Sequence, residues 1–223
     1  MTPLKSLLAA CVLISGCNGM STAYVKDPVQ DQAFLVHAGG PLALLMMASA
    51  VQWNDEYAVT VKHLPYVPGA VFQGRGDVQF FRHKADQRAP IWRQYRPGET
   101  LTAVGYNAMY MKSQGQGRAL SAMVRLDAKD GGVMYGTHDG PTVQGMSGGP
   151  VYAADGTVVG INVAYLEQDD LQKLKRADLP VQEQVSIFLP YAEISREWQR
   201  YSSQQVKGRP VPAPVGVSVA TMQ

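Results

Sequence analysis

Residues 143–165, V-Q-G-M-S-G-G-P-V-Y-A-A-D-G-T-V-V-G-I-N-V-A-Y, place the strongest constraint on how this chain folds. Within them Ser147 is preceded by Gly145 and followed by two glycines and Pro150. Glycine allows positive φ angles and close approach to the backbone, whereas proline followed by β-branched residues opposes a helix. The Asp-Gly pair at 155–156 separates two apolar runs and is a strong hairpin signal. The pattern predicts a serine in a tight turn directly before a β-hairpin.

A turn of this kind suits an oxyanion hole. We expect the N–H groups of Gly145 and Ser147 to point at one oxygen and to stabilise the negative charge that develops on it during acyl transfer. The spacing G-x-S-x-G also occurs in the nucleophile elbow of α/β-hydrolases, but there a helix follows the serine directly. Pro150 opposes that helix. A third interpretation is a glycine-rich turn between two strands that has no chemistry.

The sequence G-x-S-G-G-P-V, followed by a hairpin that ends in V-G-I-N, resembles the trypsin-like, chymotrypsin-fold serine peptidases, particularly their bacterial Deg-type branch. This resemblance covers residues 33–205. It implies an all-β, chymotrypsin-like fold of two packed six-stranded antiparallel β-barrels with a C-terminal helix. Residues 97–107 also resemble the segment that follows the catalytic aspartate strand in Deg-type enzymes.

His63 ends a β-rich segment, Y-A-V-T-V-K-H, which is similar to the segment that carries the catalytic histidine in this family. One departure is the Val-Lys pair before the histidine, where family members have small residues. Among the other histidines, His138 lies close upstream of Ser147 and is a candidate for lining the substrate cleft. We interpret His37, His83 and His138 as structural residues.

Asp77 opens the sequence D-V-Q-F-F, which resembles the family's aspartate strand except that glutamine replaces a small residue. The resemblance implies that the Asp77 carboxylate accepts the Nδ1–H of His63 and orients its ring. The alternative is an aspartate in a Gly-Arg-Gly-Asp turn without a catalytic role. Residues 64–76 leave room for one short hairpin only, so the first barrel must be trimmed.

The order His63, Asp77, Ser147 is that of the chymotrypsin-type triad. The resemblance therefore implies a serine endopeptidase that hydrolyses peptide bonds through an acyl-enzyme intermediate, with protein or peptide substrates and no metal or organic cofactor. A substrate pocket is expected from Pro141, Thr142, Asn162, Val163, Ala164 and Tyr165.

None of these pocket residues is acidic, which favours a small or apolar substrate side chain over lysine or arginine. Two alternatives stay open. One is a catalytically inactive relative that acts as a surface binding module, which the short segment between His63 and Asp77 favours. The other, an α/β-hydrolase, is disfavoured because no histidine follows position 138.

Residues 1–16 have an early lysine, an apolar run and then small residues, which together predict a signal peptide. The run is too short for a bilayer span. The sequence L-I-S-G-C resembles a lipobox, which implies that Cys17 becomes an N-terminal cysteine carrying acyl chains such as palmitate. Asn18 is typical of lipoproteins of the Gram-negative outer membrane. The alternative is an ordinary secreted protein.

The chain divides into a signal peptide at 1–16, a flexible tether at 17–32, a peptidase-like domain at 33–205 and a proline-containing tail at 206–223. The domain itself contains no cysteine, so packing has to stabilise it. The formal net charge of +2 gives no electrostatic argument for nucleic-acid binding. Further strands are expected at 33–37, 42–51, 57–61, 119–124, 133–137 and 185–189, and a helix at 191–204.

Overall fold

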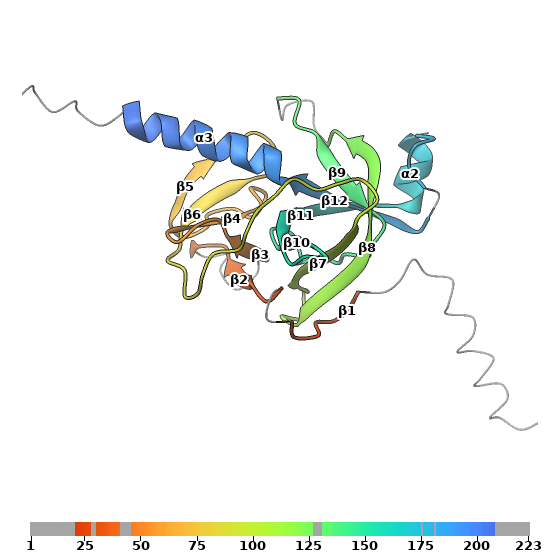
Figure 1. Cartoon of the computed structure of the whole chain (residues 1–223), viewed down its shortest axis with the longest axis horizontal. Helices are drawn as coiled ribbons and strands as arrows, with labels where there is room; N and C mark the ends of the chain where they lie inside the picture. The colour runs from red at the N-terminus through yellow and green to blue at the C-terminus, as the bar shows by residue number, and fades with distance from the viewer. Residues whose placement is uncertain are drawn as a thin grey trace, which may run out of the picture.

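The computed structural model describes residues 21–27, 30–40, 46–126, 131–174, 176–180 and 182–207. The predicted signal peptide, Cys17 and the tail from residue 208 onward lie outside the described residues. Two antiparallel sheets and two helices make up the described part (Figure 1).

The first sheet has five strands in the order β2-β3-β4-β6-β5 and is open, because β5 and β2 do not pair. Valines and phenylalanines of its inner face, such as Val51, Val59 and Phe80, are fully buried. Its strands are β2 (Ala33–His37), β3 (Met47–Gln52), β4 (Tyr57–Thr60), β5 (Ala70–Gln73) and β6 (Gln79–Arg82).

The second sheet has seven strands in the order β1-β8-β7-β10-β11-β12-β9, and β8 also pairs with β9. That extra pairing closes six of the strands into a barrel and leaves β1 outside it, on the edge of β8. The strands are β1 (Thr22–Ala23), β7 (Thr100–Tyr106), β8 (Lys112–Val124), β9 (Tyr135–His138), β10 (Pro150–Ala153), β11 (Val158–Glu167) and β12 (Gln184–Pro190).

The all-β prediction with two packed sheets and a C-terminal helix is confirmed, but the strands are not shared equally. The second barrel has the six strands that were expected. The first has five, because the chain between His63 and Asp77 forms only the short strand β5. The predicted hairpin after Ser147 is present as β10 and β11, which pair antiparallel.

The expected tether is not free along its whole length. Thr22 and Ala23 pair with Gln114 and Ser113 of β8, and the N–H of Gln32 donates to the hydroxyl of Tyr152 at 3.1 Å. The pairing of Thr22 and Ala23 extends the second sheet, so the segment that was predicted to be a flexible linker contributes an edge strand.

The C-terminal helix α3 (Tyr191–Lys207) covers the first sheet although it follows the last strand of the second (Figure 1). Its Ile194 is fully buried. The ring of Trp198 lies 5.1 Å from that of Phe80, and Tyr201 lies 6.0 Å from Tyr57. The helical spacing of these three α3 residues was visible in the sequence. Through Trp198 and Tyr201, α3 packs against the sheet whose strand β4 precedes His63.

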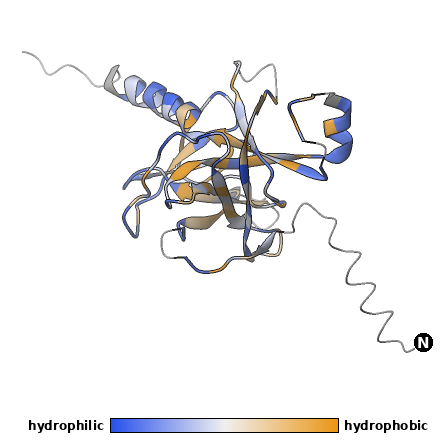
Figure 2. Cartoon of the chain, turned by 45° about the vertical axis from the view of Figure 1, so that its right-hand side comes forward, coloured by the Kyte–Doolittle hydropathy of each residue, from blue (hydrophilic) through white to orange (hydrophobic). Residues whose placement is uncertain are grey.

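A second helix, α2 (Gln168–Leu174), was not predicted. Figure 2 shows apolar residues concentrated along the strands and polar residues along α2 and α3. Within the described part of the chain, neither helix is long and apolar enough to cross a membrane.

Candidate active site

His63 and Asp77 are paired at one end of the first sheet, where His63 follows β4 and Asp77 precedes the neighbouring strand β6. The His63 Nδ1 lies 2.5 Å from Oδ2 of Asp77, and the backbone N–H of His63 donates to Oδ1 at 2.9 Å. The aspartate side chain is 17% exposed and the histidine side chain 53%. A carboxylate at Nδ1 favours the tautomer with the proton on that nitrogen. Nε2 is then left as a proton acceptor on the exposed side of the ring.

The loop that carries Asp77 is held by residues of the second half of the chain. The N–H of Asp77 donates to the hydroxyl of Tyr135 at 2.9 Å, and the N–H of Arg75 donates to Oε2 of Glu197 at 3.0 Å. Tyr135 is fully buried on β9 and Glu197 is 3% exposed on α3. Gly76 has a φ of 70°, and a Cβ there would lie 3.1 Å from the Tyr135 hydroxyl oxygen. The loop that carries Asp77 is therefore held in place by residues of β9 and α3.

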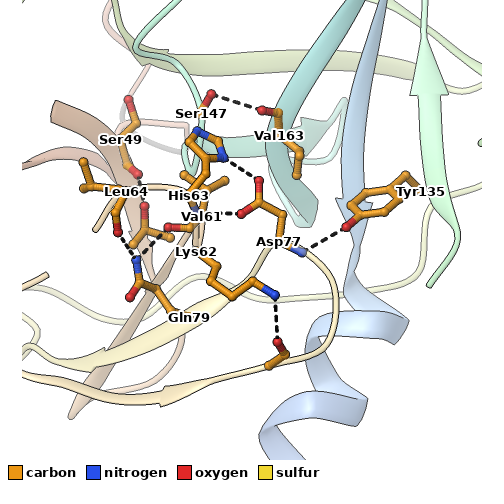
Figure 3. A network of polar contacts seen from close by, with 12 residues as sticks. Ser49, Val61, Lys62, His63, Leu64, Asp77, Gln79, Tyr135, Ser147 and Val163 are labelled. Carbon is orange, nitrogen blue, oxygen red and sulfur yellow. Dashed lines mark hydrogen bonds and ion pairs between the residues drawn. The ribbon is translucent and has the colours of Figure 1, made fainter. Parts of the chain in front are cut away.

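Gln79 fixes the backbone on either side of His63. Its Nε2 donates to the carbonyl of Val61 and to that of Leu64, both at 2.7 Å, and the side chain is fully buried. The glutamine that departs from the family pattern at this position therefore has a structural role. Figure 3 shows it beneath the segment that carries the histidine, with the His63 ring between Asp77 and Ser147.

Ser147 lies in a turn that the barrel and β3 hold together. Its carbonyl accepts the N–H of Ser49 at 2.8 Å, and the N–H of Gly148 donates to the carbonyl of Asn162 at 2.7 Å. The Ser147 hydroxyl donates to the carbonyl of Val163 at 3.1 Å (Figure 3). No hydrogen bond joins this hydroxyl to His63 within the described residues. Both side chains nevertheless line one cavity of about 420 Å³.

The turn before the serine has the geometry of a type II β-turn. The N–H of Met146 donates to the carbonyl of Val143 at 3.1 Å, and Gly145 at the third position has a φ of 96°. In the described part of the chain the N–H groups of Gly145 and Ser147 have no hydrogen-bond partner, so both donors are available to a ligand.

Ser49 positions this turn from the first sheet. The Ser49 hydroxyl donates to the carbonyl of Gly145 at 2.9 Å and accepts the N–H of Tyr106 at 2.7 Å. The side chain is fully buried. No sequence signal singled out Ser49, because its partners lie far away along the chain.

Ser147 also lines a second cavity, of about 230 Å³. Of the expected pocket residues, Thr142, Asn162, Ala164 and Tyr165 line it. The prediction was wrong for Pro141, which is buried, and for Val163, whose side chain points into the core because successive side chains of a strand alternate between faces. The lining residues that sequence analysis missed are Val143, Gln144 and Met146.

His138 is part of the barrel core and does not line either cavity beside Ser147. It is fully buried, neither ring nitrogen has a hydrogen-bond partner among the described residues, and its ring lies 6.0 Å from that of Phe188. Burial lowers its pKa to about 4, so the ring is neutral near pH 7. This position agrees with the interpretation of His138 as a structural residue and not with the alternative that it lines the cleft. The described residues contain no cluster of three or more His, Cys, Asp or Glu side chains suited to a metal ion.

Residues 48–161, just over half of the chain, match the family described as the trypsin-like peptidase domain. The chain belongs to the trypsin-like peptidase family. The matched region contains His63, Asp77 and Ser147. No curated protein matches the sequence.

Among solved structures, this trypsin-like peptidase is similar to HtrA-type and other serine proteases. The active form of the Rv3671c protease from M. tuberculosis has a TM-score of 0.60 at 14% identity, over 85% of this chain and 86% of that one. An HtrA-type protease solved with a tripeptide has a TM-score of 0.60 at 16% identity, over 76% and 60%. The serine endoprotease from Yersinia pestis gives 0.58 at 18% identity, over 82% and 69%. At these identities the likeness establishes the fold.

Proposed function

We propose that this trypsin-like peptidase is a serine endopeptidase in which Ser147 is the nucleophile, His63 the general base and Asp77 the residue that orients His63. The observation that carries the proposal is the His63–Asp77 pair, which two hydrogen bonds join and whose histidine lines the same cavity as Ser147. Family membership supports peptide bonds as the target.

In this mechanism the Ser147 Oγ attacks the carbonyl carbon of a peptide bond while Nε2 of His63 takes the hydroxyl proton. The electron pair of the C=O bond moves to the oxygen, and this oxyanion accepts hydrogen bonds from the N–H groups of Gly145 and Ser147. When the C–N bond breaks, His63 returns the proton to the leaving amine. A water molecule then repeats the sequence on the acyl-enzyme and releases the acid. Asp77 stabilises the imidazolium that forms in each half.

The Ser147 hydroxyl has to exchange one hydrogen bond before attack. It donates to the Val163 carbonyl at 3.1 Å, and catalysis requires that it donate to His63 instead. A neutral hydrogen bond of this kind contributes about 1 kcal/mol, so the exchange adds little to the barrier.

The cavity of about 230 Å³ suits a small or apolar substrate side chain. Its lining carries the methyl of Ala164 and the side chains of Met146 and Thr142, and none of its lining residues is acidic. A basic substrate side chain would enter without a countercharge, which is unfavourable in a partly enclosed site.

We further propose that Cys17 is lipidated after removal of residues 1–16 and holds the protein at the outer membrane of a Gram-negative bacterium. The sequence L-I-S-G-C-N supports this step. Metabolic labelling with a palmitate analogue tests it: the label is expected on the wild type and absent from Cys17→Ser, whereas a protein secreted without label would contradict it.

Hydrolysis of a peptide library, read by mass spectrometry, tests the activity. The full-chain wild type is expected to cut internal peptide bonds after small or apolar residues, and Ser147→Ala is expected to cut none.

The second candidate function is an inactive binding module, which the bond between Ser147 and Val163 favours. Selective binding of peptides that stay intact, by the wild type and by Ser147→Ala alike, would support the module and contradict the peptidase.

A further inference from the structure

The connection between β7 and β8 exposes three large apolar side chains in a row. Met109 is 70% exposed, Tyr110 49% and Met111 52%. We call residues 108–111 the methionine loop. Soluble domains commonly expose single apolar residues, but a contiguous group at one loop tip marks an interaction surface.

The methionine loop is built to hold these side chains outward. Oδ1 of Asn107 accepts the N–H of Met109 at 2.9 Å and that of Met111 at 3.0 Å. The backbone carbonyl of Asn107 accepts the N–H of Tyr110 at 2.9 Å, and Tyr110 has a φ of 62°. An aromatic residue in this left-handed conformation is uncommon and persists only where the surroundings enforce it. The N–H groups of residues 109–111 are thus bonded to Asn107, while the three large side chains stay exposed.

The N-terminal segment meets the fold beside this loop. β1 pairs with residues 113 and 114, which begin two positions after the end of the loop. A cavity of about 440 Å³ between the two is lined by Ser21, Thr22 and Ala23 together with Met109 and Met111. Cys17 precedes Ser21 by four residues, which span at most about 14 Å when extended.

We propose that the methionine loop docks on the surface of the lipid bilayer. The inference rests on the anchoring part of the proposed function, since acyl chains on Cys17 would hold the bilayer within reach of the loop. One lipid anchor fixes distance but not orientation, whereas methionine and tyrosine side chains inserted at the interface fix both. Tyrosine suits that position because its ring is apolar and its hydroxyl is polar. Lys26, exposed just beyond β1, suits anionic headgroups.

The docked orientation would place the mouth of the Ser147 cavity at the lipid surface. Ala108 and Tyr110 of the methionine loop also line the cavity that contains His63 and Ser147. Helix α3 lies on the other side of the molecule from β1 (Figure 1). The bilayer is therefore expected to contact the methionine loop and to leave the end of α3 in water.

Fluorescence quenching by lipid tests this orientation. The lipidated protein that starts at Cys17, carrying Met109→Cys, is labelled with a bimane probe and reconstituted in phosphatidylethanolamine and phosphatidylglycerol vesicles that contain a spin-labelled lipid. Gln204→Cys, on exposed helix α3, is the matched control. The only natural cysteines are Cys11 and Cys17. We expect quenching at position 109 several-fold greater than at 204. An unquenched probe at 109, or equal quenching at both positions, overturns the proposal.

The double variant Met109→Ser, Met111→Ser identifies other occupants if position 109 is not quenched. A changed oligomeric state in gel filtration would assign the loop to a second copy of the chain. A changed rate on a soluble peptide would assign it to substrate. Fluorophosphonate labelling of Ser147 in each variant reports the proposed activity separately, so quenching without labelling would leave the docking proposal standing while the peptidase fails.

Discussion

The two halves of the molecule hold their parts of the site in different ways. The closed six-stranded barrel fixes the Ser147 turn through its own strand β11, with one added anchor from Ser49. The open five-stranded sheet carries His63 and Asp77, but the aspartate loop is held by Tyr135 of the barrel and Glu197 of α3. The half with five strands therefore positions Asp77 through hydrogen bonds from the barrel and from α3. We therefore expect substitutions on the two sides to affect different quantities.

Removal of the Asp77 charge should have the largest effect. Asp77→Asn keeps the shape of the side chain but no longer favours the proton on Nδ1 of His63, so kcat should fall by roughly 10³- to 10⁴-fold. Steady-state peptide hydrolysis measures this. Asp155→Asn, which removes a surface carboxylate on the barrel hairpin, is the control and should leave kcat unchanged. A similar loss of kcat in both variants would contradict the role of Asp77 in orienting His63.

Substitution of Gly148 should destabilise the barrel side. Its φ is 84°, and a Cβ there would lie 2.1 Å from the carbonyl oxygen of Ser49. Gly148→Ala should lower the free energy of unfolding by at least about 3 kcal/mol, from backbone strain and steric overlap together. Urea denaturation measures it. Gly98→Ala, which has a φ of 82° but nothing within 4 Å of its Cβ, separates the strain from the overlap and should cost less. Equal losses would contradict the tight contact between the halves.

Acidification should also weaken the barrel, through His138. Burial lowers its pKa from 6.5 to about 4, so between these values the unfolded chain binds more protons than the folded one. The contribution of His138 to stability is complete above pH 6.5 and falls as the pH is lowered towards 4, by about 3 kcal/mol. Denaturation midpoints from pH 7 to pH 4 measure the slope. His138→Leu should flatten it, and an unchanged slope would contradict the assignment.

The smallest effect is expected where Tyr135 supports the aspartate loop. Tyr135→Phe removes one hydrogen bond to the N–H of Asp77, which corresponds to about 1 kcal/mol and about a fivefold loss in kcat. Thr137→Val on the same strand removes a bond to the Ala122 carbonyl at 2.7 Å, away from the loop. Both should lose similar stability, but only the first should lose activity. Equal kinetics in the two variants would mean that the loop does not need the tyrosine.

The parts of the site that the sequence predicted are those encoded by neighbouring residues. The glycines around Ser147, the Asp-Gly pair and the β-rich segment before His63 each have a local signal, and the elements expected from them are present. The trimmed first sheet followed from the short segment 64–76.

The supporting contacts had no local signal. Tyr135 and Glu197 lie 58 and 122 residues from their partners in the aspartate loop. Ser49 lies 96 residues from Gly145. A buried hydrogen bond between such distant residues depends on how the strands assemble, not on periodicity or turn chemistry. The alternative that His138 lines the cleft failed for the same reason, because the pairing of β9 with β8 and β12 places this residue in the core.

Fluorophosphonate labelling of the full chain, with the modified residue identified by mass spectrometry, tests the central claim most directly. We predict that the wild type is labelled at Ser147, that Ser147→Ala is not labelled and that His63→Ala is labelled far more slowly. A folded wild type that stays unlabelled, or that is labelled at another serine, would contradict the assignment of Ser147, His63 and Asp77 as one catalytic unit.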